Sequence, residues 1–196
     1  AFGAAGGQQI LVDAPTVGAQ PAADHQRRWL RRGLQEAGTV VVEPWLDRVA
    51  DLSAQYEVEA DGVRFLGMAR FCADHKGRFQ GLIVHDLTAG LDTDTKRFLY
   101  GDGQDSRRLQ RLYGDLGERL ARRLPPGFHG PLGVDALVYR DGRDGALRLK
   151  PIVEVNPRFT MGRVGLALSK RVLASRTATW RIVRLKDLRA AGHESA

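Results

Sequence analysis

The sequence predicts an α+β domain built from antiparallel strands and a few helices. Two dipeptides, Asp61-Gly62 and Asp141-Gly142, lie between strand-like segments and are typical of hairpin turns. The segment Gln104–Arg123 repeats leucine at helical spacing and ends at a Pro-Pro-Gly sequence. Because strand pairs and helices follow one another without a regular βαβ alternation, an α+β class is favoured over a parallel α/β sheet.

The expected elements follow from apolar spacing, β-branched runs and turn residues. Asp24 is a plausible N-cap of a basic helix that carries Trp29, Leu30 and Leu34 on its apolar side. In chain order we expect a short strand at Gln9–Asp13, a helix at Asp24–Glu36, a buried strand at Thr39–Glu43, an antiparallel meander at Leu52–Glu59, Val63–Ala73 and Phe79–His85, the helix at Gln104–Arg123, a hairpin of Val134–Tyr139 and Ala146–Asn156, a short helix at Gly165–Leu173 and a last strand near Thr177–Leu185.

Composition is that of an ordinary globular protein. Of 196 residues, 43% are hydrophobic and 27% are charged, and no apolar run approaches the roughly 20 residues that a membrane helix needs. Cys72 is the only cysteine, which excludes an intramolecular disulfide and fits a reducing cytoplasm. The chain begins with Ala rather than Met, and we expect that an upstream segment precedes it.

The formal net charge of +7 favours anionic partners, which include nucleotides and nucleic acids. The excess charge is spread along the chain, so most of it is expected on solvated surface. The segment Arg27–Arg32 places a tryptophan among four arginines and is the only candidate for a nucleic-acid surface. A nucleic-acid binder is therefore the least supported of the functions considered.

Three polar residues of the final hairpin form a candidate metal site. Glu154 and Asn156 are two residues apart on a strand, so their side chains project from the same sheet face. Asp135 joins that face if the two hairpin strands pair. Two carboxylates and an amide oxygen are ligands that suit Mg²⁺. A solvated face of an edge hairpin is the alternative reading of the same residues.

Two further segments have weaker signals for nucleotide binding. Pro44 interrupts the predicted strand beside Trp45 and Leu46, where free backbone groups and apolar side chains can meet a flat base. A strand end with a core tryptophan explains this segment equally well. The glycine-rich opening over residues 2–7 allows backbone N–H groups to approach phosphate, although it lacks the spacing of a P-loop.

Taken in order, these segments resemble the ATP-grasp superfamily of ligases. Glu154-Val155-Asn156-Pro157-Arg158 is similar to the motif in carbamoyl phosphate synthetase, and Gly165–Lys170 continues the likeness. Glu43-Pro44-Trp45-Leu46 resembles the adenine hinge of the D-alanine–D-alanine ligases. The likeness covers nearly the whole chain.

The resemblance implies an ATP-grasp fold of two α+β lobes with antiparallel sheets, residues 1–90 and 91–196, the N-terminal part being absent. It also assigns roles to individual residues. Asp135, Glu154 and Asn156 would hold Mg²⁺ against the phosphates of ATP; Glu43, Trp45 and Leu46 would bind adenine; Asp51 falls near the ribose-binding acidic position; and Gly3 and Gly6 match the glycine loop.

The implied reaction is Mg²⁺-dependent activation of a carboxylate as an acyl phosphate, which an amine, a thiol or a similar nucleophile then attacks. The chain departs from the family in lacking the lysine that precedes the glycine loop and the N-terminal domain. Many members also carry an arginine where this chain has Gly133, which leaves Arg158 and Arg163 as the candidate catalytic cations. The alternative is a nucleotide-binding module, or a truncated remnant of the fold, without turnover.

Overall fold

The computed structural model describes residues 10, 12, 24–74, 77–101, 107–173, 176–183 and 188–189. They belong to two compact units, Ala1–Leu46 and Asp47–Ala196, and each is described by itself. The described part of the first unit contains helix α2 (Asp24–Ala37). The helices found in the described ranges are all too short or too polar to cross a membrane.

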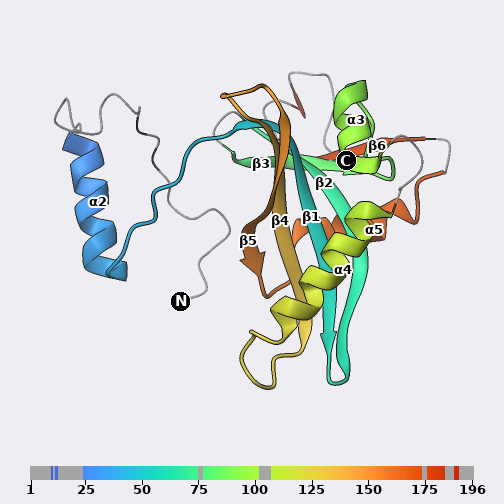
Figure 1. The fold of residues 1–196 in the computed structure, drawn as a ribbon, viewed down its shortest axis with the longest axis horizontal. Helices are drawn as coiled ribbons and strands as arrows, with labels where there is room; N and C mark the ends of the chain where they lie inside the picture. The colour runs from blue at the N-terminus through green and yellow to red at the C-terminus, as the bar shows by residue number, and fades with distance from the viewer. Residues whose placement is uncertain are drawn as a thin grey trace. The chain divides into compact units, whose positions relative to one another are not determined.

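One six-stranded antiparallel sheet organises the second unit (Figure 1). Its spatial order is β5-β4-β1-β2-β3-β6, so the meander β1-β2-β3 and the hairpin β4-β5 meet where β1 pairs with β4. The strands are β1 (Asp47–Glu59), β2 (Gly62–Ala73), β3 (Phe79–Val84), β4 (Gly130–Arg140), β5 (Leu147–Asn156) and β6 (Ala178–Arg181).

Strand β1 has neighbours on both sides and is buried over most of its length. Successive side chains of a strand point to opposite faces. Leu52, Ala54 and Tyr56 are fully buried and belong to the hydrophobic core. Asp51, Ser53 and Gln55 alternate with them and are also buried, although they are polar. The two faces of β1 therefore have opposite chemistry.

Helix α4 (Arg108–Ala121) covers the apolar face of β1 and β2 (Figure 1). The Tyr56 hydroxyl donates a hydrogen bond to the backbone oxygen of Tyr113 at 2.7 Å, and the Tyr56 ring lies against Gly117. Leu99 of α3 (Thr93–Tyr100) and Leu109 belong to the same core. A β1 side chain thus spaces the helix from the sheet.

Helix α5 (Met161–Ser169) packs on the polar face, where it contacts β2, β3 and β1. Gly165 lies against Leu82 of β3, and Gly162 lies against Gln55 and Ser53 of β1. The start of α5 consequently borders the polar residues of β1.

Most of the predicted elements are confirmed, with shifts at their ends. The meander, the hairpin and the helix at Asp24 are present, and the short helix begins at Met161 rather than Gly165. In the first hairpin the two loop residues are Ala60 and Asp61, because Glu59 pairs with Gly62. Gly62 has φ +155°, a value that a side chain would oppose. The described part of the predicted Gln104–Arg123 helix is α4.

The prediction of a buried strand at Thr39–Glu43 is wrong. Residues 39–46 form no strand, and Val41 and Val42 are 79% and 89% exposed, so the apolar run alone did not make a buried strand. The compact units divide after Leu46, and the lobes 1–90 and 91–196 stay a prediction. The meander and the hairpin share one sheet across residue 90 because β1 pairs with β4, not only with β2.

We predict that Gly117→Ala destabilises the second unit by about 2 kcal/mol, since overpacking a close contact forces its surroundings to shift. A Cβ at this position would lie 2.4 Å from Cε1 of Tyr56, and Tyr56 is fully buried. Gly114→Ala is the matched control, because a Cβ there meets open space on the same helix. Alanine should raise stability at Gly114 by up to about 1 kcal/mol.

Urea unfolding of both variants and the wild type provides the measurement. Equal midpoints for the two variants would show that α4 does not rest on Tyr56 as described.

Candidate functional site

The three predicted metal ligands lie on one face of the sheet. In the β4–β5 ladder Asp135 is directly opposite Glu154, and Gly133 is directly opposite Asn156. Residues opposite one another in an antiparallel pair project from the same face. The amide nitrogen of Asn156 donates to Oδ2 of Asp135 at 3.2 Å, so two of the three side chains are in direct contact.

Asp135 is a half-buried carboxylate with donors on both oxygens. The Ser53 hydroxyl donates to Oδ1 at 2.6 Å, opposite the Asn156 amide at Oδ2. Burial raises the pKa of Asp135, and the negative charge of Glu154 raises it further, while the hydrogen bond from Ser53 and the positive charge of Arg158 lower it. A cation at this point would remove the repulsion between the two carboxylates.

Glu154 and Asn156 differ in exposure and in bonding. Glu154 is exposed on the edge strand β5, whereas Asn156 is 4% exposed. The amide oxygen of Asn156 accepts a hydrogen bond from Nη2 of Arg158 at 2.8 Å. The site therefore combines a half-buried carboxylate, an exposed carboxylate and an amide whose oxygen already faces the Arg158 guanidinium.

Asp51, the predicted ribose-binding residue, lies on β1, on the same face as Ser53. Its carboxylate pairs with Arg48 at 2.9 Å and is 9% exposed. Burial raises its pKa to about 6 in spite of Arg48, and the negative charge of Asp135 adds to the rise. Asp51 is thus electrostatically coupled to the predicted metal site.

The structure separates the two candidate arginines. Arg158 contacts Asn156 and is exposed, so it stands beside the predicted ligands. Arg163, on α5, forms an ion pair with Glu57 and donates to the backbone oxygen of Tyr56 at 3.3 Å. Its guanidinium also lies over the Phe159 ring, 5.7 Å from the centroid. These contacts assign Arg163 to holding α5 on β1.

The predicted nucleotide residues outside the hairpin lie elsewhere in the chain. Glu43, Trp45 and Leu46 belong to the first unit and precede β1 without forming a strand. Trp45 is 49% exposed, and Leu46 is half-buried. Gly3 and Gly6 lie outside the described residues. An adenine-binding role for the first three residues stays a prediction.

Sequence reasoning missed three residues that bond to the site or to its neighbours. Ser53 contacts Asp135, Gln55 donates to the Ser53 oxygen at 2.7 Å, and Thr160 donates to the Gln55 amide oxygen at 2.8 Å. The first two carry a signal in hindsight, because they are polar positions within a strand that is otherwise buried. Thr160 carries none, since it is 105 residues from Gln55.

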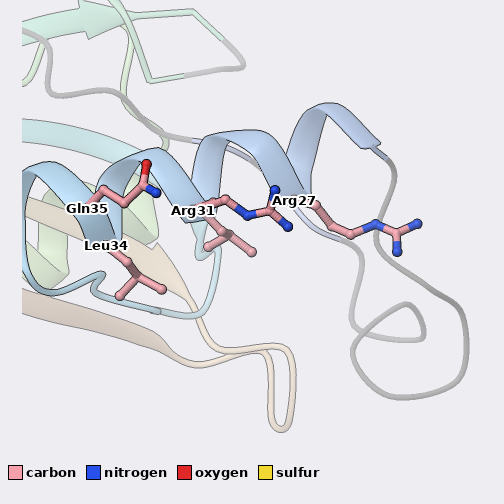
Figure 2. Close-up of a pocket in the computed structure, with 5 residues that line it drawn as sticks. Arg27, Arg31, Leu34 and Gln35 are labelled. Atoms are coloured by element: carbon pink, nitrogen blue, oxygen red, sulfur yellow. The ribbon is translucent and has the colours of Figure 1, made fainter.

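Helix α2 is amphipathic, and none of its residues is buried. A hollow on its surface is lined by polar and apolar side chains, which are those of Arg27, Leu30, Arg31, Leu34 and Gln35 (Figure 2). Leu34 is 53% exposed. Asp24 pairs with Arg27 at 3.4 Å and Glu36 with Arg32 at 2.7 Å, so acidic residues of the helix offset part of its basic charge. This local neutralisation weakens the reading of α2 as a nucleic-acid surface.

No protein-family model matches the chain, and a search of curated proteins gave no match. Within the described ranges, no three side chains of His, Cys, Asp or Glu gather closely enough to hold a metal ion. The predicted site contains two such side chains and an amide. The case for it therefore depends on the geometry of Asp135, Glu154 and Asn156.

We predict that Asp51→Asn becomes more stable relative to the wild type as pH rises from 4 to 7.5. A carboxyl with a folded pKa of about 6, above its unfolded value, adds stability when protonated and loses it as pH rises through the folded pKa. The relative gain should be roughly 2 kcal/mol, allowing for the screening that a partly hydrated site provides.

Urea unfolding at several pH values without divalent metal provides the measurement. Asp61→Asn, an exposed carboxylate of the first hairpin loop, is the control for a general change in charge. A difference between Asp51→Asn and the wild type that does not vary with pH would contradict the assigned burial of the charge.

Proposed function

We propose that this chain is part of an ATP-grasp type ligase that binds ATP with Mg²⁺ and activates a carboxylate as an acyl phosphate. In this reaction a carboxylate oxygen attacks the γ-phosphorus, and ADP leaves. An amine or a similar nucleophile then attacks the acyl carbon, and inorganic phosphate leaves. The observation that carries the proposal is the pairing of Asp135 with Glu154 beside Asn156 on one sheet face.

The donor set suits the proposed cation. Mg²⁺ prefers hard oxygen ligands and usually keeps water and phosphate oxygens in its remaining positions. Asp135 and Glu154 supply two carboxylates, and Asn156 supplies an amide oxygen if its contact with Arg158 is exchanged. When bound, the metal would neutralise charge on the phosphates, which is a large part of phosphoryl-transfer catalysis.

Arg158 gains a role from the same exchange. Its guanidinium is held by the Asn156 amide oxygen and by the backbone oxygen of Phe159 at 3.3 Å, both of them neutral acceptors. A phosphate or acyl-phosphate oxygen is a stronger acceptor for guanidinium than either. Arg158 is therefore proposed as the cation that stabilises the transferred group, in preference to Arg163, which is committed to Glu57.

The remaining assignments rest on the resemblance alone. Glu43, Trp45 and Leu46 are proposed to bind adenine, Asp51 the ribose, and Gly3 and Gly6 the phosphates. A cytoplasmic location is proposed from the single Cys72. A nucleotide-binding module without turnover is the alternative, and it would bind ATP with Mg²⁺ but form no ADP.

We predict that Mg²⁺ strengthens ATP binding to this chain by at least about tenfold, and that Glu154→Gln and Asn156→Ala each remove most of that gain. The physical reason is the loss of a metal ligand in both variants. Titration calorimetry with ATP, in excess Mg²⁺ and in EDTA, measures the effect. Glu59→Gln is the matched control, because Glu59 is a carboxylate at the far end of β1 and pairs with Arg64 at 2.6 Å.

Absence of ATP binding in Mg²⁺, or equal binding with and without the metal, would refute the proposed site. ATP binding that responds to Mg²⁺ and to both substitutions, without ADP formation over a panel of carboxylates and amines, would favour the module without turnover.

A further inference from the structure

Asp135 receives a directed chain of hydrogen bonds that begins at the start of α5. Thr160 donates to Gln55 at 2.8 Å, Gln55 donates to Ser53 at 2.7 Å, and Ser53 donates to Asp135 at 2.6 Å. Every bond points the same way, from Thr160 towards the carboxylate. Chains of this kind polarise one another and strengthen each bond.

This series of hydrogen bonds determines which acceptor the Ser53 proton faces. A hydroxyl has one proton to donate, and its oxygen accepts from other donors. Because the Gln55 amide nitrogen already donates to the Ser53 oxygen, the Ser53 proton is directed to Asp135. The Gln55 amide is oriented in turn by Thr160, whose hydroxyl occupies its oxygen. Ser53 and Gln55 are each only 2% exposed, so little water competes for these contacts.

Close backbone packing surrounds these hydrogen-bonded side chains. A Cβ at Gly162 would lie 2.4 Å from Nε2 of Gln55, and one at Gly133 would lie 2.7 Å from Cγ2 of Thr160. Strand β4 and helix α5 can approach these side chains so closely only because both positions are glycine. The amide of Gln55 is therefore packed closely against α5, and its bonds to Thr160 and Ser53 select which end faces each hydroxyl.

Thr160 gives up its usual role to join this chain. It occupies the N-cap position of α5, where a threonine hydroxyl commonly accepts a hydrogen bond from the first turn, a contact worth about 1 kcal/mol. The Thr160 side chain makes no capping bond and donates to Gln55 instead. Helix stability alone would favour the cap, so the bond to Gln55 indicates a second demand on this residue.

We propose that Ser53, Gln55 and Thr160 are positioning residues that fix the Asp135 carboxylate for a divalent cation. This inference rests on the proposed function, because it assigns a purpose to the order around a proposed metal ligand. The three residues do not touch the metal. They set the direction of the Asp135 carboxylate, so that Oδ2, which accepts the longer bond from Asn156, is the oxygen proposed to face a cation.

The experiment compares isosteric and conservative changes at the two ends of the chain. Thr160→Val removes the hydroxyl and keeps the shape, whereas Thr160→Ser keeps the donor. Ser53→Ala removes the last donor. The control is Ser169→Ala, which removes a hydroxyl of α5 that bonds only to Leu166 of the same helix. The probe is Mn²⁺ as a spectroscopic substitute for Mg²⁺, measured by electron paramagnetic resonance with ATP present, together with ATP affinity in EDTA.

Thr160→Val and Ser53→Ala should each weaken Mn²⁺ binding by about tenfold or more, the usual effect of losing an outer contact to a metal ligand. Thr160→Ser and Ser169→Ala should stay within about twofold of the wild type, since the donor chain is kept. ATP affinity in EDTA should stay unchanged in all four variants, because the substitutions are expected to act only through the metal. A lower ATP affinity in EDTA would indicate a general loss of structure instead. Urea midpoints identify any variant that fails to fold. If Ser53→Ala or Thr160→Val is unfolded, the other of these two variants provides the test.

Unchanged Mn²⁺ affinity in a folded Thr160→Val or Ser53→Ala variant would overturn the positioning role. If the positioning variants leave Mn²⁺ affinity unchanged while Glu154→Gln lowers it in the same assay, the positioning role is wrong and the proposed metal site stands. If neither Glu154→Gln nor the positioning variants change Mn²⁺ affinity, the proposed metal site itself is wrong.

Discussion

The alternation of β1 over Asp51–Tyr56 is the constraint on which the rest of the second unit depends. Helices α4 and α5 contact its two faces, and a slip of one residue would exchange these faces. Its even-numbered side chains, such as Leu52 and Tyr56, supply the core under α4. Its odd-numbered side chains, such as Ser53 and Gln55, form the floor of the polar face. One register therefore sets both the stability of the domain and the place of its candidate site.

Burial of charge is the cost of this arrangement. Asp51 and Asp135 lie on the same face, and each raises the energy of the other when both are ionised. Arg48 compensates Asp51 in part, while neutral donors surround Asp135. Apolar side chains at such positions would often give a more stable protein than carboxylates do. Their position beside Asn156 and Arg158 is the observation from which the proposed cation site is argued.

The sequence was sufficient for the local elements and for the shared face of the metal residues. Alternation placed Glu154 and Asn156 on one face, and the pairing of the hairpin strands placed Asp135 on it. The register irregularity between Asp135 and Leu137, which the turn does not predict, sets Asp135 opposite Glu154. The sequence was insufficient where the structure of a segment depends on partners that are distant along the chain. Val41 and Val42 have the composition of a strand, but strands exist only when they pair, and residues 39–46 join no strand ladder in the described part of the chain. The same limit hid Thr160, whose contact with Gln55 exists only after α5 docks.

The two carboxylates of the candidate site are held to different degrees, and this difference has a physical consequence. Asp135 is fixed by donors from β1 and β5, whereas Glu154 is exposed on an edge strand. A cation entering this site would meet one ligand already in place and would have to order the other, at the cost of its side-chain entropy. Pre-orientation of Asp135 lowers the total cost, because only Glu154 and the Asn156 amide must then move. In the proposed site, a partly buried ligand held by hydrogen bonds would thus stand beside an exposed one, and the proposed Mg²⁺ would order only the second on binding.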